Sequence, residues 1–200
     1  MEKRKIIFLY SEIAVYFLAC IEKLSKFQDI EIHIIRWPLN QEAPFEFVFP
    51  SNVTIYNRND FESDQTLINK VNELNPSILY CSGWLDKGYL KTCKLYKKKI
   101  PVIVGFDNQW KGSLTQYIAT LISPFKKLNH FNHCWVPGKL QVEFARRLGF
   151  KESTILTGFY SCDYDFFNKQ FIANKKNKED NFPKRFIYVG RYTKSKGVIN

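Results

Sequence analysis

The chain has 200 residues, of which 45% are hydrophobic and 24% are charged, a balance that supports a packed core and excludes global disorder. Its 30 lysines and arginines against 19 acids give a net charge of +11, which favours an anionic partner: a nucleotide phosphate, a nucleic acid or an acidic membrane surface. No apolar run is long enough to predict a transmembrane helix.

Strands and helices alternate along the chain. Short apolar runs predict strands at 5–10, 30–36, 53–56, 78–81, 101–106, 131–136 and 153–157. Apolar residues at helical spacing predict helices at 12–26, 64–74, 86–99, 113–128 and 138–148, with a break or kink in the fourth near Pro124. This order predicts an α/β fold, a Rossmann-like doubly wound parallel sheet covered on both faces. Ligands in such sheets bind at the carboxyl ends of the strands.

The composition changes after residue 160. Residues 161–184 are polar and lysine-rich, and are predicted to be a hinge and an exposed linker. Residues 185–190 then read as a new strand that ends in a glycine. Because one strand is not stable alone, we expect a first domain at 1–160, and we expect 185–200 to be the start of a second domain that is otherwise missing.

The segment that follows this strand is basic. Gly190 allows a phosphate to approach the backbone, Arg191 offers a planar fork for phosphate oxygens, and Lys196 can reach the same diphosphate. Gly197 precedes the next expected helix, whose N-terminus would also favour an anion. An ordinary basic turn between a strand and a helix is the alternative interpretation.

The order of these motifs resembles a known family. A strand, then Gly-Arg, then Lys-Gly at 186–200 is similar to the opening of the second domain of retaining glycosyltransferases with the GT-B fold, family 4, often called group 1. Residues 135–138, 144–150 and 155–158 resemble the late strands and helix of that family's first domain, and 158–167 resembles its hinge. The resemblance covers the whole chain in topology.

The resemblance implies two Rossmann-like domains that face a cleft, with a nucleotide sugar held mainly by the second. It implies that Gly190, Arg191 and Lys196 bind the donor diphosphate and stabilise the departing nucleoside diphosphate. It further implies transfer of a hexose, with retention, to a saccharide or lipid-linked acceptor. No metal, cofactor or nucleic acid is expected, the expected location is the cytoplasm, and the 200-residue chain alone is expected to be inactive.

Candidate site residues of the first domain follow its strands. Asp107 comes after the strand at 101–106, where many family members carry a histidine, and is the candidate catalytic residue. The candidate acceptor-binding or sugar-binding residues are Ser11, Glu12, Trp84, Asn108 and Trp110. A helix-capping aspartate and buried tryptophans are the alternative interpretation.

The sequence also departs from the family. Ser11 and Glu12 stand where a glycine-rich turn is usual, and the family's later pair of glutamates would lie beyond Asn200. Three alternatives therefore stay open: a non-catalytic GT-B-like binding module, a GT-B sugar epimerase, and a basic protein of nucleic acids or membrane surfaces.

Two helices carry surface patterns that fit either solvent or the inner face of a membrane. One is a lysine stripe on the helix at 86–99, formed by Lys87, Lys91, Lys94 and Lys98. The other is an amphipathic pattern in the segment 113–128, formed by Ile118, Leu121, Ile122 and Phe125 and followed by Lys126 and Lys127. A plain solvated face is the alternative for the lysine stripe.

Overall fold

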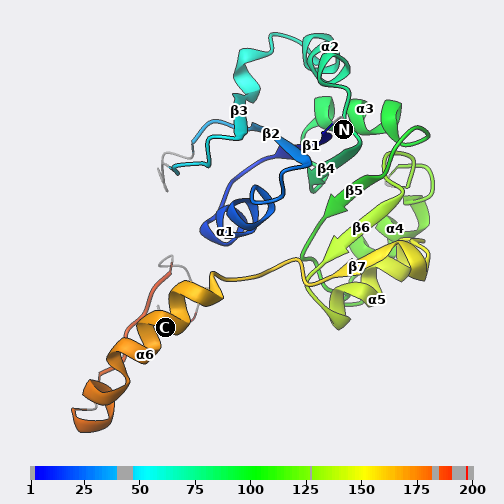
Figure 1. Ribbon diagram of the computed structural model, residues 1–200. Coiled ribbons are helices and arrows are strands. Elements are labelled where there is room, and N and C mark those ends of the chain that lie inside the picture. The colour runs from blue at the N-terminus through cyan, green and yellow to red at the C-terminus, as the bar shows by residue number, and fades with distance from the viewer. Residues whose placement is uncertain (1–2, 40–46, 127, 182–184, 191–196, 198–200) are drawn as a thin grey trace. The chain divides into compact units, whose positions relative to one another are not determined.

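A computed structural model of the protein describes residues 3–39, 47–126, 128–181, 185–190 and 197 (Figure 1). The chain divides into two compact units, Met1–Cys162 and Asp163–Asn200, and each is described by itself.

The first unit is built on a sheet of seven strands, counted over the described residues, in the order β3-β2-β1-β4-β5-β6-β7. All neighbouring strands are parallel. The strands are β1 Arg4–Tyr10, β2 Ile30–Arg36, β3 Val53–Asn57, β4 Ile78–Ser82, β5 Val102–Gly105, β6 His133–Val136 and β7 Ile155–Thr157. The predicted Rossmann-like parallel sheet is confirmed.

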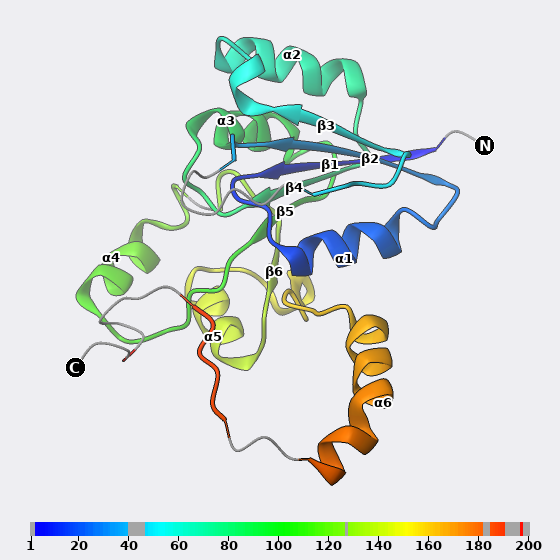
Figure 2. The same ribbon diagram turned by 90° about the vertical axis from the view of Figure 1, so that its left-hand side faces the viewer.

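Helices connect the strands and cover the sheet. They are α1 Val15–Leu24, α2 Asp64–Leu74, α3 Lys87–Tyr96, α4 Leu114–Ile122 and α5 Lys139–Arg147, with short 3-10 turns η1 Arg58–Asp60 and η2 Glu152–Thr154. One core cluster joins the sheet to α2, α3 and α5, and a second joins it to α1. Figure 2 shows α1 on the opposite side of the strands from α2 and α3. The sheet is therefore covered on both faces, as the apolar strands require.

Local side chains cap the starts of α2 and α3. Ser63 caps α2 by accepting a hydrogen bond from the Thr66 amide, and Asp86 caps α3 by accepting one from the Tyr89 amide. The helix expected at 113–128 ends at Ile122 as α4, two residues before Pro124, because a proline has no backbone N–H with which to continue the helical hydrogen bonds. The predicted break is confirmed.

The second unit corrects two predictions. The segment expected as an exposed linker is exposed, but it forms a helix, α6 Tyr164–Asp180. Asp163 caps α6 by accepting from the Phe166 amide, and Lys175 lies one turn before Glu179. A polar, lysine-rich composition suits a solvated helix as well as a linker, because these residues have good helix propensity.

The expected strand at 185–190 is also absent. These described residues are exposed and take part in none of the described strand pairings. A strand is defined by the hydrogen-bonded ladder to its neighbour, so an apolar run without a neighbour forms none. Over the described residues, no helix is long and apolar enough to cross a bilayer.

Candidate functional site

A pocket of about 510 Å³ opens at the carboxyl ends of β1, β4 and β5. The chain leaves β1 in one direction to build β2 and β3, and returns to β1's other side to build β4 and β5. Neighbouring strands whose connections diverge leave a crevice at this edge, the usual ligand position in such folds. The lining residues are Tyr10, Ser11, Glu12, Tyr16, Ser82, Gly83, Trp84, Leu85, Gly105, Phe106, Asp107, Asn108, Phe159 and Tyr160.

Two serines join the loops on either side of this crevice. The Ser11 amide donates to Ser82 Oγ over 2.7 Å, and the two Oγ atoms lie 3.1 Å apart. They meet because β1 and β4 pair in register up to Leu9 and Cys81. Ser82 was not among the predicted site residues, although it begins the loop that follows the predicted strand at 78–81, at the same edge of the sheet.

Asp107 is held at the pocket wall by Tyr160. The Tyr160 hydroxyl donates to Asp107 Oδ2 over 2.7 Å, and Gln141 Nε2 donates to the Asp107 carbonyl over 3.2 Å. The ring of Tyr16 packs edge-on against Tyr160, with centroids 4.9 Å apart. Burial and the neighbouring carboxylate raise the pKa of Tyr160 well above its ordinary value, so its hydroxyl keeps its proton and stays a donor at neutral pH.

Buried tyrosines lie below the pocket. Tyr10 stacks on Phe17 with centroids 4.1 Å apart and on Tyr80 at 5.9 Å. Burial raises the pKa of both tyrosines. Among the described residues, the buried Tyr80 hydroxyl has no hydrogen-bond partner. The floor of the pocket is therefore aromatic and uncharged at neutral pH.

The two candidate tryptophans lie in different surroundings. Trp84 lines the pocket and packs on Phe106, with centroids 5.3 Å apart. Trp110 is not among the pocket's lining residues. Its ring contacts Tyr117 at 5.0 Å and Phe144 at 6.0 Å, and the Arg147 guanidinium lies 4.5 Å above it.

The structure thus brings most of the predicted first-domain site residues to one place. Ser11, Glu12, Trp84, Asp107 and Asn108 all line the pocket. Tyr160 joins them and was not predicted as a site residue, although it follows the predicted strand at 153–157 at the same edge of the sheet. Its contact with Asp107, 53 positions away, is the part that the local sequence does not show.

The charge of the lining limits what this pocket can hold. Its two ionisable acids are Glu12 and Asp107, and among the described lining residues there is no lysine or arginine. A diphosphate needs cationic or amide donors. Carboxylate, amide and hydroxyl groups above an aromatic floor suit the hydroxyls and apolar ring face of a sugar instead.

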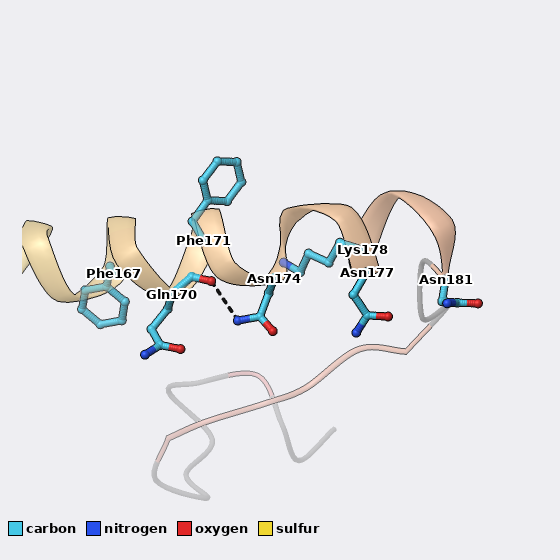
Figure 3. Close-up of a pocket in the computed structure, with 7 residues that line it drawn as sticks. All are labelled: Phe167, Gln170, Phe171, Asn174, Asn177, Lys178 and Asn181. Carbon is cyan, nitrogen blue, oxygen red and sulfur yellow. Dashed lines mark hydrogen bonds between the residues drawn. The ribbon is translucent and has the colours of Figure 1, made fainter.

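The predicted diphosphate site belongs to the second unit. Gly190 is described and exposed, whereas Arg191 and Lys196 lie outside the described residues. A second pocket, of about 600 Å³, runs along α6 and is lined by residues of that helix and its C-cap: Phe167, Gln170, Phe171, Asn174, Asn177, Lys178 and Asn181 (Figure 3). Asn174 Nδ2 donates to the Gln170 carbonyl there. Among the residues that the structure describes, α6 and its C-cap alone line this second pocket, whereas several elements line the first.

Comparison with protein-family models gives no match. No curated protein matches the sequence.

Solved structures share the fold. The UDP-GlcNAc 2-epimerase of Methanocaldococcus jannaschii aligns over 88% of this chain and 50% of its own, with a TM-score of 0.53 and 15% identity. A UDP-GlcNAc 2-epimerase of Neisseria meningitidis bound to UDP-GlcNAc aligns over 90% and 54%, with a TM-score of 0.53 and 13% identity. A further UDP-N-acetylglucosamine 2-epimerase aligns over 78% and 48%, also with a TM-score of 0.53 and 13% identity. The chain spans about half the length of these structures. At such identities the likeness establishes the fold alone.

Proposed function

We propose that this chain is the sugar-binding half of an enzyme that acts on a nucleoside-diphosphate sugar. The observation that carries this proposal is the pocket at the ends of β1, β4 and β5. Its lining offers hydrogen-bond acceptors and hydroxyl groups above an aromatic floor, and its described lining residues include no lysine or arginine. Such a lining fits the sugar and leaves the diphosphate to be bound elsewhere. The fold likeness to enzymes named for a nucleotide sugar supports the same ligand class.

In this proposal the diphosphate is bound by a second lobe. The basic segment that contains Gly190, Arg191 and Lys196 is its candidate start, since an arginine fork and a lysine suit phosphate oxygens. Activity then requires both lobes, because electrostatic stabilisation of a reacting group needs donors fixed in a water-excluded site.

We propose epimerisation of the sugar as the reaction. Inverting the sugar carbon next to the anomeric centre breaks its C–H bond on one face and re-forms it on the other. The electron pair of that bond can form a C=C bond as the neighbouring C–O bond to the diphosphate breaks, and it returns when the C–O bond re-forms, so the step needs groups that take and return a proton but no oxidant. The pocket offers Asp107, oriented by Tyr160, and Glu12. The solved structures with this fold that are named epimerases support this reaction class.

Glycosyl transfer is the second candidate. The observation that favours it is the Gly-Arg and Lys-Gly pattern at 190–197, with the hinge-like segment before it. Transfer differs measurably from epimerisation, because it releases a nucleoside diphosphate and needs an acceptor hydroxyl.

One experiment separates the two reactions. The two-lobed protein is incubated with UDP-GlcNAc in D2O and followed by NMR, with and without a saccharide acceptor. Epimerisation puts deuterium on the inverted carbon without net release of UDP. Transfer releases UDP only when the acceptor is present and leaves the sugar's C–H bonds intact. If neither product forms with UDP-GlcNAc or with a panel of other nucleotide sugars, the proposed function is wrong.

The role of Asp107 is tested in the same assay. Asp107→Asn keeps the shape of the side chain and its partner Tyr160, but it removes the proton acceptor, so turnover is expected to fall by about 10²–10⁴-fold. Glu22→Gln, a matched change at an exposed position of α1 away from the pocket lining, should leave turnover unchanged. Equal turnover in both variants would remove Asp107 from the mechanism.

A further inference from the structure

Helix α4 presents its apolar side to solvent. Large apolar residues recur at i, i+3, i+4, i+7, i+8 and i+11 and form one stripe along α4 and the turn after it. Its members are Leu114, Tyr117, Ile118, Leu121, Ile122 and Phe125, which are between 39% and 81% exposed. The same spacing in α2 buries Leu67, Ile68, Val71 and Leu74 in the core, whereas no residue of α4 is buried.

Polar contacts hold α4 in this orientation. Ser123, which ends the helix, is fully buried and donates to the Leu148 carbonyl over 2.8 Å. At the other end, Gln116 Nε2 donates to the Gln109 carbonyl and its Oε1 accepts from the Lys111 amide, each over 2.7 Å. Figure 2 shows α4 away from the strands, at the left of the view. Because both ends are anchored through polar groups, the outward stripe belongs to the fold of this unit.

An exposed stripe of this kind marks an interaction surface, since folded proteins rarely leave contiguous large apolar residues in water. We define the α4 stripe as the apolar residues named above. Its surroundings indicate which partner would cover it.

The charged side chains that flank the α4 stripe in the sequence are positive, and Asp107 is the acidic residue that shares a pocket with Lys111 at the start of the helix. Lys111 precedes the helix and Lys126 follows Phe125, and both are exposed. Lys97 donates to the Leu128 carbonyl just beyond. Between Asp107 and Glu143 the sequence contains no acidic residue. Burial is the largest cause that lowers the pKa of His130, and the nearby Lys94 and Lys97 lower it further, as expected in a region of positive potential.

We propose that the α4 stripe docks on an anionic lipid bilayer, with its apolar residues entering the headgroup region and the flanking lysines contacting lipid phosphates. An apolar helix face bordered by lysines is the pattern that binds such surfaces, through buried apolar area together with attraction to anionic lipid. A second copy of this chain fits less well, because it would bring the same lysines face to face. This inference stands apart from the reaction proposed above.

The test measures binding of the 200-residue chain to vesicles by flotation. Vesicles of phosphatidylcholine alone are compared with vesicles that also contain phosphatidylglycerol. The chain should float with the anionic vesicles, and raised salt should weaken this binding because exposed charges are screened. Leu121→Gln with Phe125→Gln should lower the affinity by about tenfold or more, since two exposed apolar side chains no longer enter the headgroup region.

The matched control changes two similarly exposed apolar residues of another region, Val15→Gln with Phe27→Gln, and should bind like the wild type. Lys111→Gln with Lys126→Gln should reduce the preference for anionic vesicles and flatten the salt dependence. Circular dichroism should show the same fold in every variant, because the changed side chains are exposed.

Three results would overturn the proposal. The first is equal vesicle binding by the stripe variant and the control variant. The second is no preference of the wild type for anionic vesicles. The third is a wild-type protein that does not bind vesicles and is a dimer by light scattering, whereas the stripe variant is a monomer. That result would assign the α4 stripe to contact with a second copy of the chain.

Discussion

Gly105 ends β5 directly against the ring of Tyr80. A Cβ atom at this position would lie 1.9 Å from the Tyr80 hydroxyl oxygen and 3.0 Å from the ring of Phe159. Both rings are buried, so neither can move aside easily. The absence of a side chain here lets β5 approach the aromatic floor of the pocket, a close approach that only glycine permits.

We therefore expect Gly105→Ala to lower the free energy of unfolding by about 1–3 kcal/mol, the usual cost of overpacking a core. Urea unfolding measures the change. Gly138→Ala is the matched control, because a Cβ there meets nothing within 4 Å. A Gly105→Ala protein as stable as the control would contradict the packing described for Tyr80.

The two tryptophans should respond differently to the same substitution. Trp84→Leu removes a ring from the pocket lining and should weaken binding of the proposed ligand, a nucleotide sugar, by a protein that includes the proposed second lobe. Trp110→Leu removes a ring packed on Phe144 and Tyr117 and should lower the free energy of unfolding by about 1–3 kcal/mol with little effect on binding. Calorimetric titration and urea unfolding of both variants test this, and the reverse pattern would refute the assignment.

At the scale of elements, an ion-pair network joins η1, α2 and α3. Arg58 donates to Asp64 over 3.1 Å and to Asp86 over 3.2 Å, and Lys91 donates to the other oxygen of Asp64 over 2.6 Å. Asp86 also accepts from Trp37 Nε1 over 2.9 Å. Lys91, a member of the lysine stripe predicted on the helix at 86–99, is therefore paired within the protein. The network fixes the start of α3 beside the loop that carries Trp84.

Because of this network, the free energy of unfolding should depend on pH in the acidic range. The hydrogen bond from Lys91, and then the nearby Arg58, lower the pKa of Asp64 below its ordinary value of 3.8. A lowered carboxyl pKa contributes stability that is complete above the unfolded-state value and is lost as the pH falls through the folded-state value. Wild type should therefore lose its advantage over Asp64→Asn as the pH falls below about 4.

Urea unfolding of both proteins over this pH range is the measurement, and Asp180→Asn, at the exposed end of α6, is the control. A constant difference in the free energy of unfolding between wild type and Asp64→Asn at every pH would be inconsistent with this ion pair.

At the scale of the whole molecule, buried tyrosines should limit stability at alkaline pH. Burial is the largest cause that raises the pKa of each of them above the ordinary 10.0: Tyr10, Tyr80, Tyr89 and Tyr160. A raised pKa contributes stability that is complete below the unfolded-state value and is lost as the pH rises through the folded-state value. Unfolding is therefore expected as the pH rises above about 10.

Tyrosinate absorbance and circular dichroism, recorded together, check this expectation. Part of the tyrosinate signal should appear only in step with the loss of the native circular dichroism. Complete ionisation of all tyrosines while the circular dichroism stays native would contradict the burial of these side chains.

The first unit should fold without the second. Both core clusters are made of residues no later than Phe159. A chain ending at Cys162 is therefore expected to keep the thermal midpoint of the 200-residue chain, because no apolar residue of either core is removed. Differential scanning calorimetry compares the two. An unfolded short chain would show that residues after 162 stabilise the sheet.

Much of the fold could be predicted because it depends on local patterns. Isoleucine-rich runs such as 30–36 and the helical spacing between Leu67 and Leu74 each indicate one element, and their alternation leaves a parallel sheet as the solution that buries both faces. The rule for ligand position in such sheets then predicts Ser11, Trp84 and Asp107 at one edge, because each follows a strand at its carboxyl end.

Where local pattern was ambiguous, prediction failed. The polar composition of 161–184 suited a linker and a solvated helix equally, and α6 formed. The apolar run at 185–190 is typical of a strand, but strand formation depends on a neighbour that no local pattern supplies.

Composition and periodicity were enough to predict the strands and helices of the first unit, their alternation and the sheet edge at which a ligand would bind, because each depends on residues near one another in the sequence. The contact of Tyr160 with Asp107, the packing of Trp110 away from the pocket and the outward stripe of α4 followed from folding alone. Each joins residues distant in the sequence, or depends on which side of a helix meets the core. Periodicity shows that a helix has an apolar side, but only packing determines whether that side faces the protein or the solvent.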